Sequence, residues 1–290
     1  MKVAIIVFSP SGHTLQAANI FKKEFENKGI CTQLIDITKK PAYLDKTRIK
    51  QQLEKDLGEH DVLLIGGPIY AGHMEGHILR LIEQLPEAGK KYGALAVPFA
   101  TYGGVHSSVA LEETGKLLRI KKRKPILGVK IAAEHTLTRT FTNTIYKGRP
   151  GKDEEAITLQ AVGKIIEITS QNAESMKDAG KSFAYSRSVE RLMFKLFSQE
   201  AIHNRYKRVS IDTSKCTRCR KCISVCPVNM FDFAKGEVRM ARDNKQCILC
   251  AECYHHCPAG AILHPYIEVA RRRLKDGNAA LEKEPSAIYL

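Results

Sequence analysis

KVAIIVFSPSGHT occupies positions 2–14 of the chain. Its first seven residues form an apolar run of the kind found in buried parallel strands. The next residues are small and polar, and residues 14–28 then carry apolar side chains at helical spacing, with Gly29 as a stop signal. The stretch therefore predicts a buried strand, a tight turn and a helix, in that order.

The same alternation continues along the N-terminal half of the chain. Further strands are expected at 32–37, 61–67, 92–100 and 125–133, and helices at 46–57, 76–85, 105–118 and 153–176. Alternating strands and helices predict a doubly wound, five-stranded parallel α/β sheet with right-handed crossovers. Ligands of such sheets bind beyond the carboxyl ends of the strands.

The turn at 9–14 has the chemistry of an anion site. Backbone N–H groups and the helix dipole favour an anion at a helix N-terminus. Ser9, Ser11 and Thr14 add hydroxyl donors, and Gly12 lets the backbone approach a ligand closely. The chain lacks both the lysine of a P-loop and the G-x-G-x-x-G fingerprint here, so a monophosphate is the expected ligand.

Two further loops follow the third and fourth expected strands, GGPIYAGH at 66–73 and PFATYGG at 98–104. Together with the turn at 9–14, they make residues 1–176 resemble the flavodoxins. The resemblance implies bound FMN, with its phosphate held by Ser9, Ser11, Gly12, His13 and Thr14. It places one side of the flavin ring against Pro68, Ile69, Tyr70 and Ala71, and the other against Thr101, Tyr102, Gly103 and Gly104. Tyr102 is expected to stack on the ring, because the chain has no tryptophan.

The expected ring loops are rich in histidine. His73, His77 and His106 lie in or beside them, and Glu75 is the one acidic residue that we count beside these loops. Flavodoxins are commonly acidic around the ring, so we expect a less negative potential for the second reduction of the flavin, with a pH dependence near 6.5. The alternative is that these histidines are ordinary exposed loop residues. A protonated His13 would add a charge-assisted bond to the phosphate.

Eight of the nine cysteines lie between positions 216 and 257, where the pattern C-x2-C-x2-C-x3-C-P occurs twice, offset by 31 residues. Three cysteines spaced in this way can wrap a loop around one iron–sulfur cubane, and a distant cysteine supplies the fourth ligand. A zinc ribbon instead needs two well-separated C-x2-C pairs, and dense cysteines in a cytosolic chain speak against disulfides. Cys31 stands alone and is expected to be a buried, inert thiol.

Residues 209–264 resemble the bacterial-type ferredoxins with two [4Fe–4S] clusters. In that family the fourth cysteine of each run binds the other cluster. The resemblance therefore assigns cluster 1 to Cys216, Cys219, Cys222 and Cys257. It assigns cluster 2 to Cys247, Cys250, Cys253 and Cys226.

The rest of the chain is divided by composition. Residues 177–208 form a basic linker with a helix, expected between the two domains, with a membrane-surface helix as the alternative; residues 265–290 are expected to be a tail with a helix and a surface arm. The formal net charge of +15 favours acidic partners over nucleic acid, since FMN and the clusters bring negative charge. We expect residues 121–124 to be a solvated loop. No apolar run could span a membrane and no cleavage site follows the first strand, so a cytoplasmic protein is expected.

A flavin and two clusters in one chain indicate an electron-transfer protein, similar to the fused flavodoxin–ferredoxin carriers of anaerobes. Such a protein relays electrons between FMN, the two [4Fe–4S] clusters and external redox proteins. An FMN-dependent reductase of a quinone or an NAD(P)H-linked acceptor is the alternative, and a redox-sensing module is a third. The sequence favours a carrier over an enzyme, and it leaves open whether electrons pass within one chain or between the subunits of a homodimer.

Overall fold

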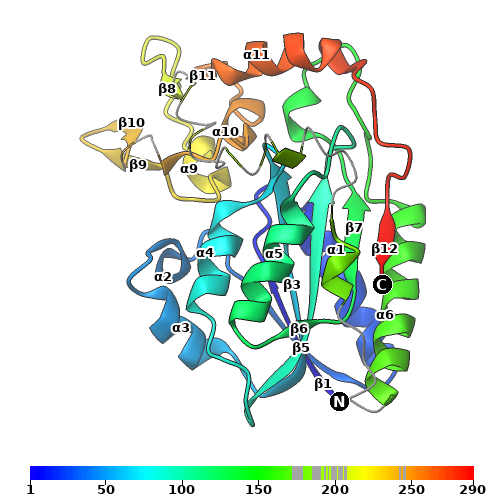
Figure 1. Cartoon of the computed structure of the whole chain (residues 1–290). Coiled ribbons are helices and arrows are strands. Elements are labelled where there is room, and N and C mark those ends of the chain that lie inside the picture. Colours follow the sequence, from blue (N-terminus) through cyan, green and yellow to red (C-terminus); the bar gives the residue numbers. More distant parts are fainter. Residues whose placement is uncertain are drawn as a thin grey trace.

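Figure 1 shows the computed structural model of the chain, which describes residues 1–171, 179–184, 208–241 and 246–290, and the single residues 191, 192, 194, 196, 201, 205 and 243. Its centre is a sheet in the order β12-β7-β5-β3-β1-β2. Five of these strands are parallel, namely β1 (Lys2–Val7), β2 (Cys31–Asp36), β3 (His60–Tyr70), β5 (Tyr92–Tyr102) and β7 (Gly128–Ala132). The expected five-stranded parallel sheet is therefore present, with one strand added at its edge.

Helices cover both faces of the sheet. One face carries α1 (His13–Asn27) and α6 (Lys152–Ser170), and the other carries α3 (Ile49–Asp56), α4 (Gly76–Gln84) and α5 (Ala110–Ile120). The short elements are α2 (Pro41–Leu44), β4 (His73–Met74), β6 (Lys124–Pro125), the 3-10 turn η1 (Thr136–Thr138) and the 3-10 turn η3 (Ala179–Lys181).

The apolar run of β1 is explained by these two layers. Side chains alternate across a strand, so Val3, Ile5 and Val7 pack toward α1 and α6, whereas Ala4 and Ile6 pack toward α3, α4 and α5. All five are buried. A strand covered on both faces needs apolar residues at every position, which is why no alternation is visible in its sequence.

The cysteine-rich segment forms a second lobe above the carboxyl ends of the parallel strands (Figure 1). Its elements are β8 (Ser210–Ile211), α9 (Lys221–Val225), β9 (Phe231–Ala234), β10 (Glu237–Met240), α10 (Glu252–His255) and β11 (Ile262–Leu263). Strands β8 and β11 pair antiparallel, as do β9 and β10.

The two lobes share one hydrophobic core. The cluster that holds Leu81 of α4 and Ala110 of α5 continues into the second lobe through Cys226, Ile248 and Cys250. Backbone contacts add to this packing, since Lys39 N–H donates to the Pro227 carbonyl at 3.0 Å. The second lobe is therefore fixed over the end of the sheet where ligands of this fold bind.

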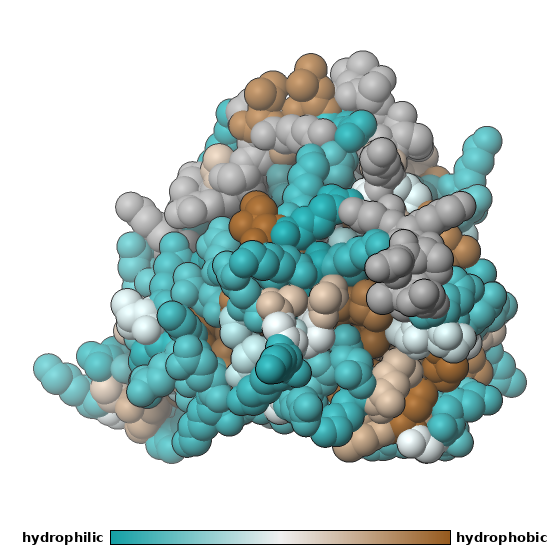
Figure 2. All heavy atoms as spheres, turned by 60° about the horizontal axis from the view of Figure 1, so that its bottom comes forward, coloured by the Kyte–Doolittle hydropathy of each residue, from teal (hydrophilic) through white to brown (hydrophobic). Residues whose placement is uncertain are grey.

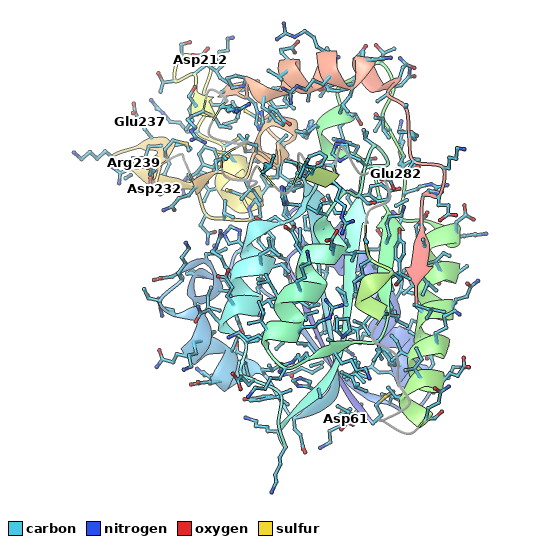
Figure 3. All side chains as sticks on the ribbon, viewed as in Figure 1. Asp61, Asp212, Asp232, Glu237, Arg239 and Glu282 are labelled. Atoms are coloured by element: carbon cyan, nitrogen blue, oxygen red, sulfur yellow. The ribbon has the colours of Figure 1, made fainter. Side chains whose placement is uncertain are left out.

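The C-terminal tail differs from the expected surface arm. After α11 (Tyr266–Arg273) and the 3-10 turn η5 (Lys275–Gly277), the chain descends along the molecule and ends in β12 (Ala287–Tyr289), which pairs antiparallel with β7. Glu282 of this tail, labelled in Figure 3, forms an ion pair with the buried Lys130 at 2.7 Å. Three residues were too short a signal for the sequence to reveal this strand.

Two other expectations are wrong. Arg123, expected in a solvated loop, is 1% exposed, and its guanidinium donates to the Pro86 carbonyl at 2.6 Å. Burial lowers the pKa of Arg123 to about 10. Cys31, expected to be buried, is exposed because it begins the edge strand β2.

Most of the expected basic linker at 177–208 lies outside the described residues. Within its described part, Phe183 is buried against Gly115 and Gly128 of the first lobe. In the part of the chain that the structure describes, no helix is both long and apolar enough to cross a membrane. Figure 2 shows that the face at the amino ends of the strands is mainly hydrophilic, with scattered apolar residues.

Candidate cofactor sites

The turn after β1 leaves the start of α1 open. Gly12 is the N-cap residue of α1 and has a φ of 86°, in the left-handed region that favours glycine. A Cβ atom at this position would meet no atom within 4 Å, so the backbone borders open space here. Ser9 Oγ accepts a hydrogen bond from Leu15 N–H at 2.9 Å and closes the turn. This open helix N-terminus fits the phosphate of a mononucleotide.

The side chains of the turn have unequal surroundings. Ser9 and Thr14 are buried, and Ser11 and His13 are partly exposed. Thr14 Oγ1 lies 2.7 Å from Oγ1 of Thr101, at the end of β5. The phosphate turn and the second expected ring loop are therefore in direct contact.

The first expected ring loop is a tight hairpin at the end of β3. Ile69 pairs with Met74 and Tyr70 pairs with His73, which leaves Ala71 and Gly72 as the two turn residues. Their φ angles are 52° and 80°, as a type I′ hairpin turn requires. Pro68 of β3 is in register with Thr101 of β5, so the two ring loops lie side by side.

The second ring loop is covered by other parts of the chain. Cβ atoms at Gly103 and Gly104 would lie 2.5 Å from the side chains of His135 and Tyr146. These two glycines are therefore needed for a close approach of the 134–146 segment, whatever the loop binds. The sequence reasoning had assigned this segment no role.

The two tyrosines of the expected ring site face different surroundings. Tyr102 is 4% exposed, its hydroxyl donates to the Glu284 carbonyl at 3.3 Å, and the Lys130 ammonium lies 5.2 Å from its ring centroid. Tyr70 packs against the shared core beside Cys250 and Glu252 of the second lobe, and burial raises its pKa well above the usual value. Tyr102 thus contacts the C-terminal tail, and Tyr70 packs against the core cluster that contains Cys250.

The histidines of the ring loops are paired with carboxylates. His77 Nδ1 lies 2.9 Å from Glu75 Oε1, and His73 Nδ1 lies 3.0 Å from Glu113 Oε2. Burial alone would raise the pKa of Glu75, but His77 holds it below its usual value. The expectation of a loop region poor in acidic groups is wrong, because Glu113 of α5 pairs with His73 and Glu282 of the tail accepts a hydrogen bond from Ser107 N–H. Both histidines are also buried, which excludes the reading of them as exposed loop residues.

Arg139 is the residue that the sequence reasoning missed. Its guanidinium donates to Glu134 at 2.6 Å and to Glu252 at 2.9 Å, and lies 3.4 Å from His13 Nε2. It thereby connects the phosphate turn to α10, which carries the expected cluster ligand Cys253. Burial and the positive charge of Arg139 lower the pKa of His13, which disfavours the protonated ring expected there.

The cysteine repeat is also a repeat of backbone conformation. Left-handed φ angles occur at Arg218 and again at Leu249, 31 residues later, and at Arg220 and again at Ala251. These residues stand between the first three cysteines of each run, where the chain must bend to turn the three thiols toward one cluster. In each run the fourth cysteine also accepts a 3.2 Å bond from an N–H group four residues later, Cys226 from Met230 and Cys257 from Ala261. Such N–H donors stabilise thiolate sulfur.

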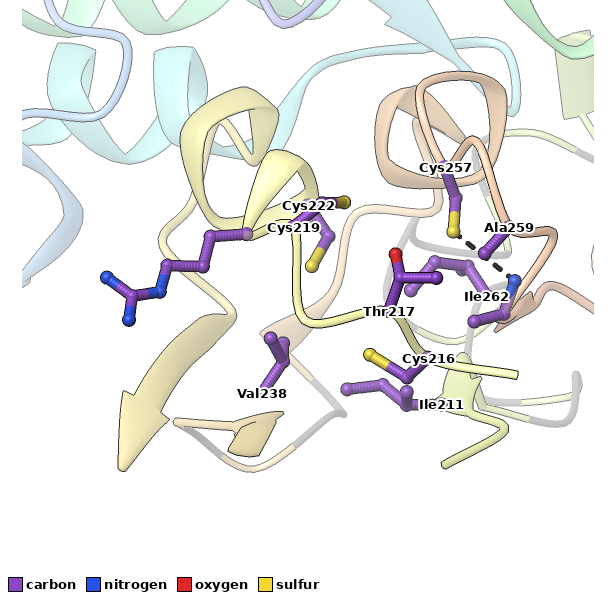
Figure 4. A pocket seen from close by; sticks show the side chains of 11 residues that line it. Ile211, Cys216, Thr217, Cys219, Cys222, Val238, Cys257, Ala259 and Ile262 are labelled. Carbon is purple, nitrogen blue, oxygen red and sulfur yellow. Dashed lines mark hydrogen bonds between the residues drawn. The ribbon is translucent and has the colours of Figure 1, made fainter. Parts of the chain in front are cut away.

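Four of the expected ligands surround one pocket, shown in Figure 4. Cys216, Cys219 and Cys222 come from the first run and Cys257 comes from the second. These are the four residues that the ferredoxin resemblance assigns to cluster 1. The remaining lining is mostly apolar or small, including Ile211, Val238 and Ile262, and Arg220 is its charged member. A pocket with four thiols and a mostly apolar wall fits a [4Fe–4S] cubane.

The other four cysteines are gathered more deeply. Cys226, Cys250 and Cys253 are buried and Cys247 is partly buried. Burial raises the pKa of Cys247 to about 11, and the charge of nearby Cys226 adds to this effect. Cys226 acts in the same direction on Cys250 and Cys253, so it lies among the cysteines of the second run. Buried thiols of this kind ionise readily only when a metal takes the charge.

Two sequence models of known families match the chain. The family described as NADPH-dependent FMN reductase matches residues 1–136, and the family described as a 4Fe-4S dicluster domain matches residues 215–262. No curated protein sequence matches. The second match contains all eight cysteines of the two runs.

Several solved structures are similar to part of the chain. A flavodoxin from the domain Archaea is 16% identical, covers 59% of this chain and 100% of its own, and has a TM-score of 0.39. The apo form of an NADH:FMN oxidoreductase is 18% identical, covers 65% of this chain and 98% of its own, and has a TM-score of 0.42. The rubredoxin oxygen:oxidoreductase of the anaerobe Desulfovibrio gigas is 13% identical over 58% of this chain, with a TM-score of 0.42, and only 36% of that longer chain is covered.

Proposed function

We propose that this chain, in which a flavodoxin-like domain is followed by a 4Fe-4S dicluster domain of ferredoxin type, relays electrons between one FMN, two [4Fe–4S] clusters and external redox proteins. When bound, the flavin exchanges one or two electrons and each cluster exchanges one. The contribution of the polypeptide is to hold these groups at fixed positions and to exclude water between them.

The residues proposed for each group are those that the family resemblances imply, and the geometry above supports them. The turn at 9–14 would hold the FMN phosphate, and the loops at 68–71 and 101–104 would border the ring. Cys216, Cys219, Cys222 and Cys257 would hold cluster 1, and Cys226, Cys247, Cys250 and Cys253 would hold cluster 2. We propose Tyr70 rather than Tyr102 as the aromatic neighbour of the ring, because the Lys130 ammonium lies over the ring of Tyr102 and the hydroxyl of Tyr102 is bonded to the tail.

One observation carries the relay within a single chain. The second lobe presents residues of its cluster 2 segment to the flavodoxin-like domain. Cys250 belongs to the core cluster against which Tyr70 packs, Glu252 pairs with Arg139, and Ala251 shares a smaller cluster with Phe141. All three partners come from the carboxyl end of the sheet, so cluster 2 is the proposed neighbour of the flavin.

The test is an anaerobic reductive titration of purified protein, combined with iron, sulfide and flavin analysis. The proposal expects one FMN and two clusters per chain and an uptake of two electrons by the flavin and one by each cluster. A Cys31→Ser background removes the one cysteine outside the two runs. Protein that contains only one cluster, or flavin without iron, would contradict the proposal.

A second candidate is an FMN-dependent reductase that uses NAD(P)H. The match of residues 1–136 to a family described as NADPH-dependent FMN reductase favours it. The lobe that covers the carboxyl end of the sheet favours the relay instead, since it occupies the side from which a nicotinamide would reach the ring. Steady-state oxidation of NADPH and NADH, with and without a quinone, separates the two: sustained turnover without a protein partner supports the reductase.

A further inference from the structure

The two sets of cluster ligands differ in their access to solvent. Cys219 is exposed and Cys216 and Cys257 are partly exposed, whereas three of the four cluster 2 cysteines are buried. Electron tunnelling weakens steeply with distance, so a partner protein exchanges electrons through the group nearest the surface. In this chain that group would be cluster 1, whose expected ligands line the pocket shown in Figure 4.

The segment around this pocket is strongly basic. Between positions 208 and 239 there are seven basic and three acidic residues, whereas positions 241–264 hold two of each. Four of the basic side chains, Lys215, Arg218, Arg220 and Lys221, stand within seven positions around Cys219, and all four are exposed.

The acidic residues of this lobe compensate only part of that charge. Figure 3 labels Asp212, Asp232 and Glu237 at the outer end of the lobe. Asp212 pairs with Lys215 at 3.5 Å and Asp232 pairs with Arg239 at 2.8 Å. These pairs leave the charges of Arg218, Arg220 and Lys221 to face solvent beside the exposed cysteine.

An apolar side chain lies beside the same pocket. Phe233 is the strand partner of the pocket residue Val238 and is 36% exposed, with the Arg220 guanidinium 3.7 Å from its ring centroid. Apolar side chains within a charged rim are typical of protein docking surfaces. Charge complementarity then selects a partner whose own surface is acidic.

We infer that the cluster 1 surface, defined by Lys215, Arg218, Cys219, Arg220 and Lys221, is the docking site for an acidic one-electron redox protein. The inference rests on the proposed relay and adds the place where electrons enter or leave it. In one encounter, one electron passes between the partner and cluster 1, one being oxidised as the other is reduced, with no bond made or broken. Nucleic acid is the other polyanion that such a surface could meet, but an exposed redox ligand at its centre favours a redox protein.

The test compares two charge-reversed variants of the oxidised, cofactor-loaded protein. Arg218→Glu with Lys221→Glu changes the cluster 1 surface and leaves Arg220 on Phe233. Lys46→Glu with Lys50→Glu makes the same charge change in the exposed α2–α3 segment of the first lobe. The binding probe is an acidic [2Fe–2S] ferredoxin, titrated by calorimetry at low and at high salt.

At low salt we expect the first variant to bind the ferredoxin at least about tenfold more weakly than the wild type, and the control to change by less than about twofold. High salt should remove most of the difference. The same variant, reduced with dithionite, should react more slowly with anionic ferricyanide and faster with cationic hexaammineruthenium(III).

Three results would overturn the docking site: equal binding by the two variants, no binding by the wild type at low salt, or tighter binding of a DNA duplex than of the ferredoxin. The reductive titration is repeated on both variants. Normal electron uptake together with any of these results rejects the docking site alone, and failure of uptake in the wild type rejects the relay itself.

Discussion

Among single side chains, Arg139 connects three segments of the chain that lie far apart in sequence. It joins residues that are 126 and 113 positions away, His13 and Glu252. Its carboxylate partners Glu134 and Glu252 are 16% and 7% exposed, so each would be left largely buried without it. A guanidinium can serve both because its donors form a rigid fork.

Replacement of Arg139 by Gln should therefore lower the free energy of unfolding by about 2 kcal/mol, since two charge-assisted bonds are lost. The measurement is urea unfolding of the loaded protein at neutral pH. Arg272→Gln, at an exposed position of α11, is the matched control and should change stability by less than about 0.5 kcal/mol. Equal stability of the two variants would show that the Arg139 bridge contributes nothing.

A second prediction concerns His60, which is 2% exposed at the start of β3, at the end of the sheet opposite the second lobe. Burial lowers the pKa of His60, against a smaller opposing effect of the Gly58 carbonyl. The unfolded chain therefore binds a proton near pH 6.5 that the folded chain does not bind. The contribution of the neutral His60 to the free energy of unfolding is therefore fully present above that pH. It decreases as the pH drops below about 6.5, by at most about 1.4 kcal/mol per pH unit.

His60→Gln should remove this part of the pH dependence. We expect the stability difference between wild type and variant to change as the pH is lowered from 7.5 to about 5.5, in favour of the variant. Urea midpoints at several pH values measure it. Parallel curves for the two proteins would mean that His60 titrates alike in both states.

The sequence was most informative where the spacing of residues along the chain determines which ligand they can bind. The spacing of the cysteines alone gave the two runs, and the pairing of Cys257 with the first run came from the family resemblance; the structure brings those four residues to one pocket. Arg139 and Glu113 were not predictable in the same way. Glu113 contacts Met74 and Arg139 contacts Glu252, which are 39 and 113 positions away, and no local pattern encodes such contacts.

Among the elements, β12 was the least visible in the sequence and has a clear structural role. It covers the edge of β7, and the tail before it places Glu282 on Lys130 and on the Ser107 N–H group. An uncovered edge strand is a site of unwanted pairing. The longer elements were found because their apolar periodicity extends over many residues, which a three-residue strand cannot show.

Ile288 of β12 packs against the core face formed by α1 and α6. Ile288→Glu should therefore lower the free energy of unfolding by about 2 kcal/mol, because it buries a carboxylate or detaches the strand. Leu290→Glu, two positions later and 57% exposed, should change it by less than about 0.5 kcal/mol. If thermal unfolding of the two variants coincides, β12 does not stabilise the sheet.

At the level of the whole molecule, the shared core makes the two lobes one cooperative unit. A cluster that runs from α4 and α5 into the cysteine loops cannot open in one lobe without exposing apolar surface of the other. We therefore expect flavin release and cluster bleaching to follow a single unfolding transition in anaerobic denaturant titrations. Two separated transitions would show that the lobes unfold independently.

The central claim is that the flavin and cluster 2 exchange electrons within one chain. The most direct measurement is flash photoreduction of the flavin by a deazaflavin, with the flavin and cluster absorbances followed in time over a wide range of protein concentration. The contacts of Cys250, Ala251 and Glu252 with the end of the sheet predict a first-order transfer whose rate constant does not change on dilution. A rate that falls in proportion to protein concentration would contradict the claim and assign the transfer to encounters between separate molecules.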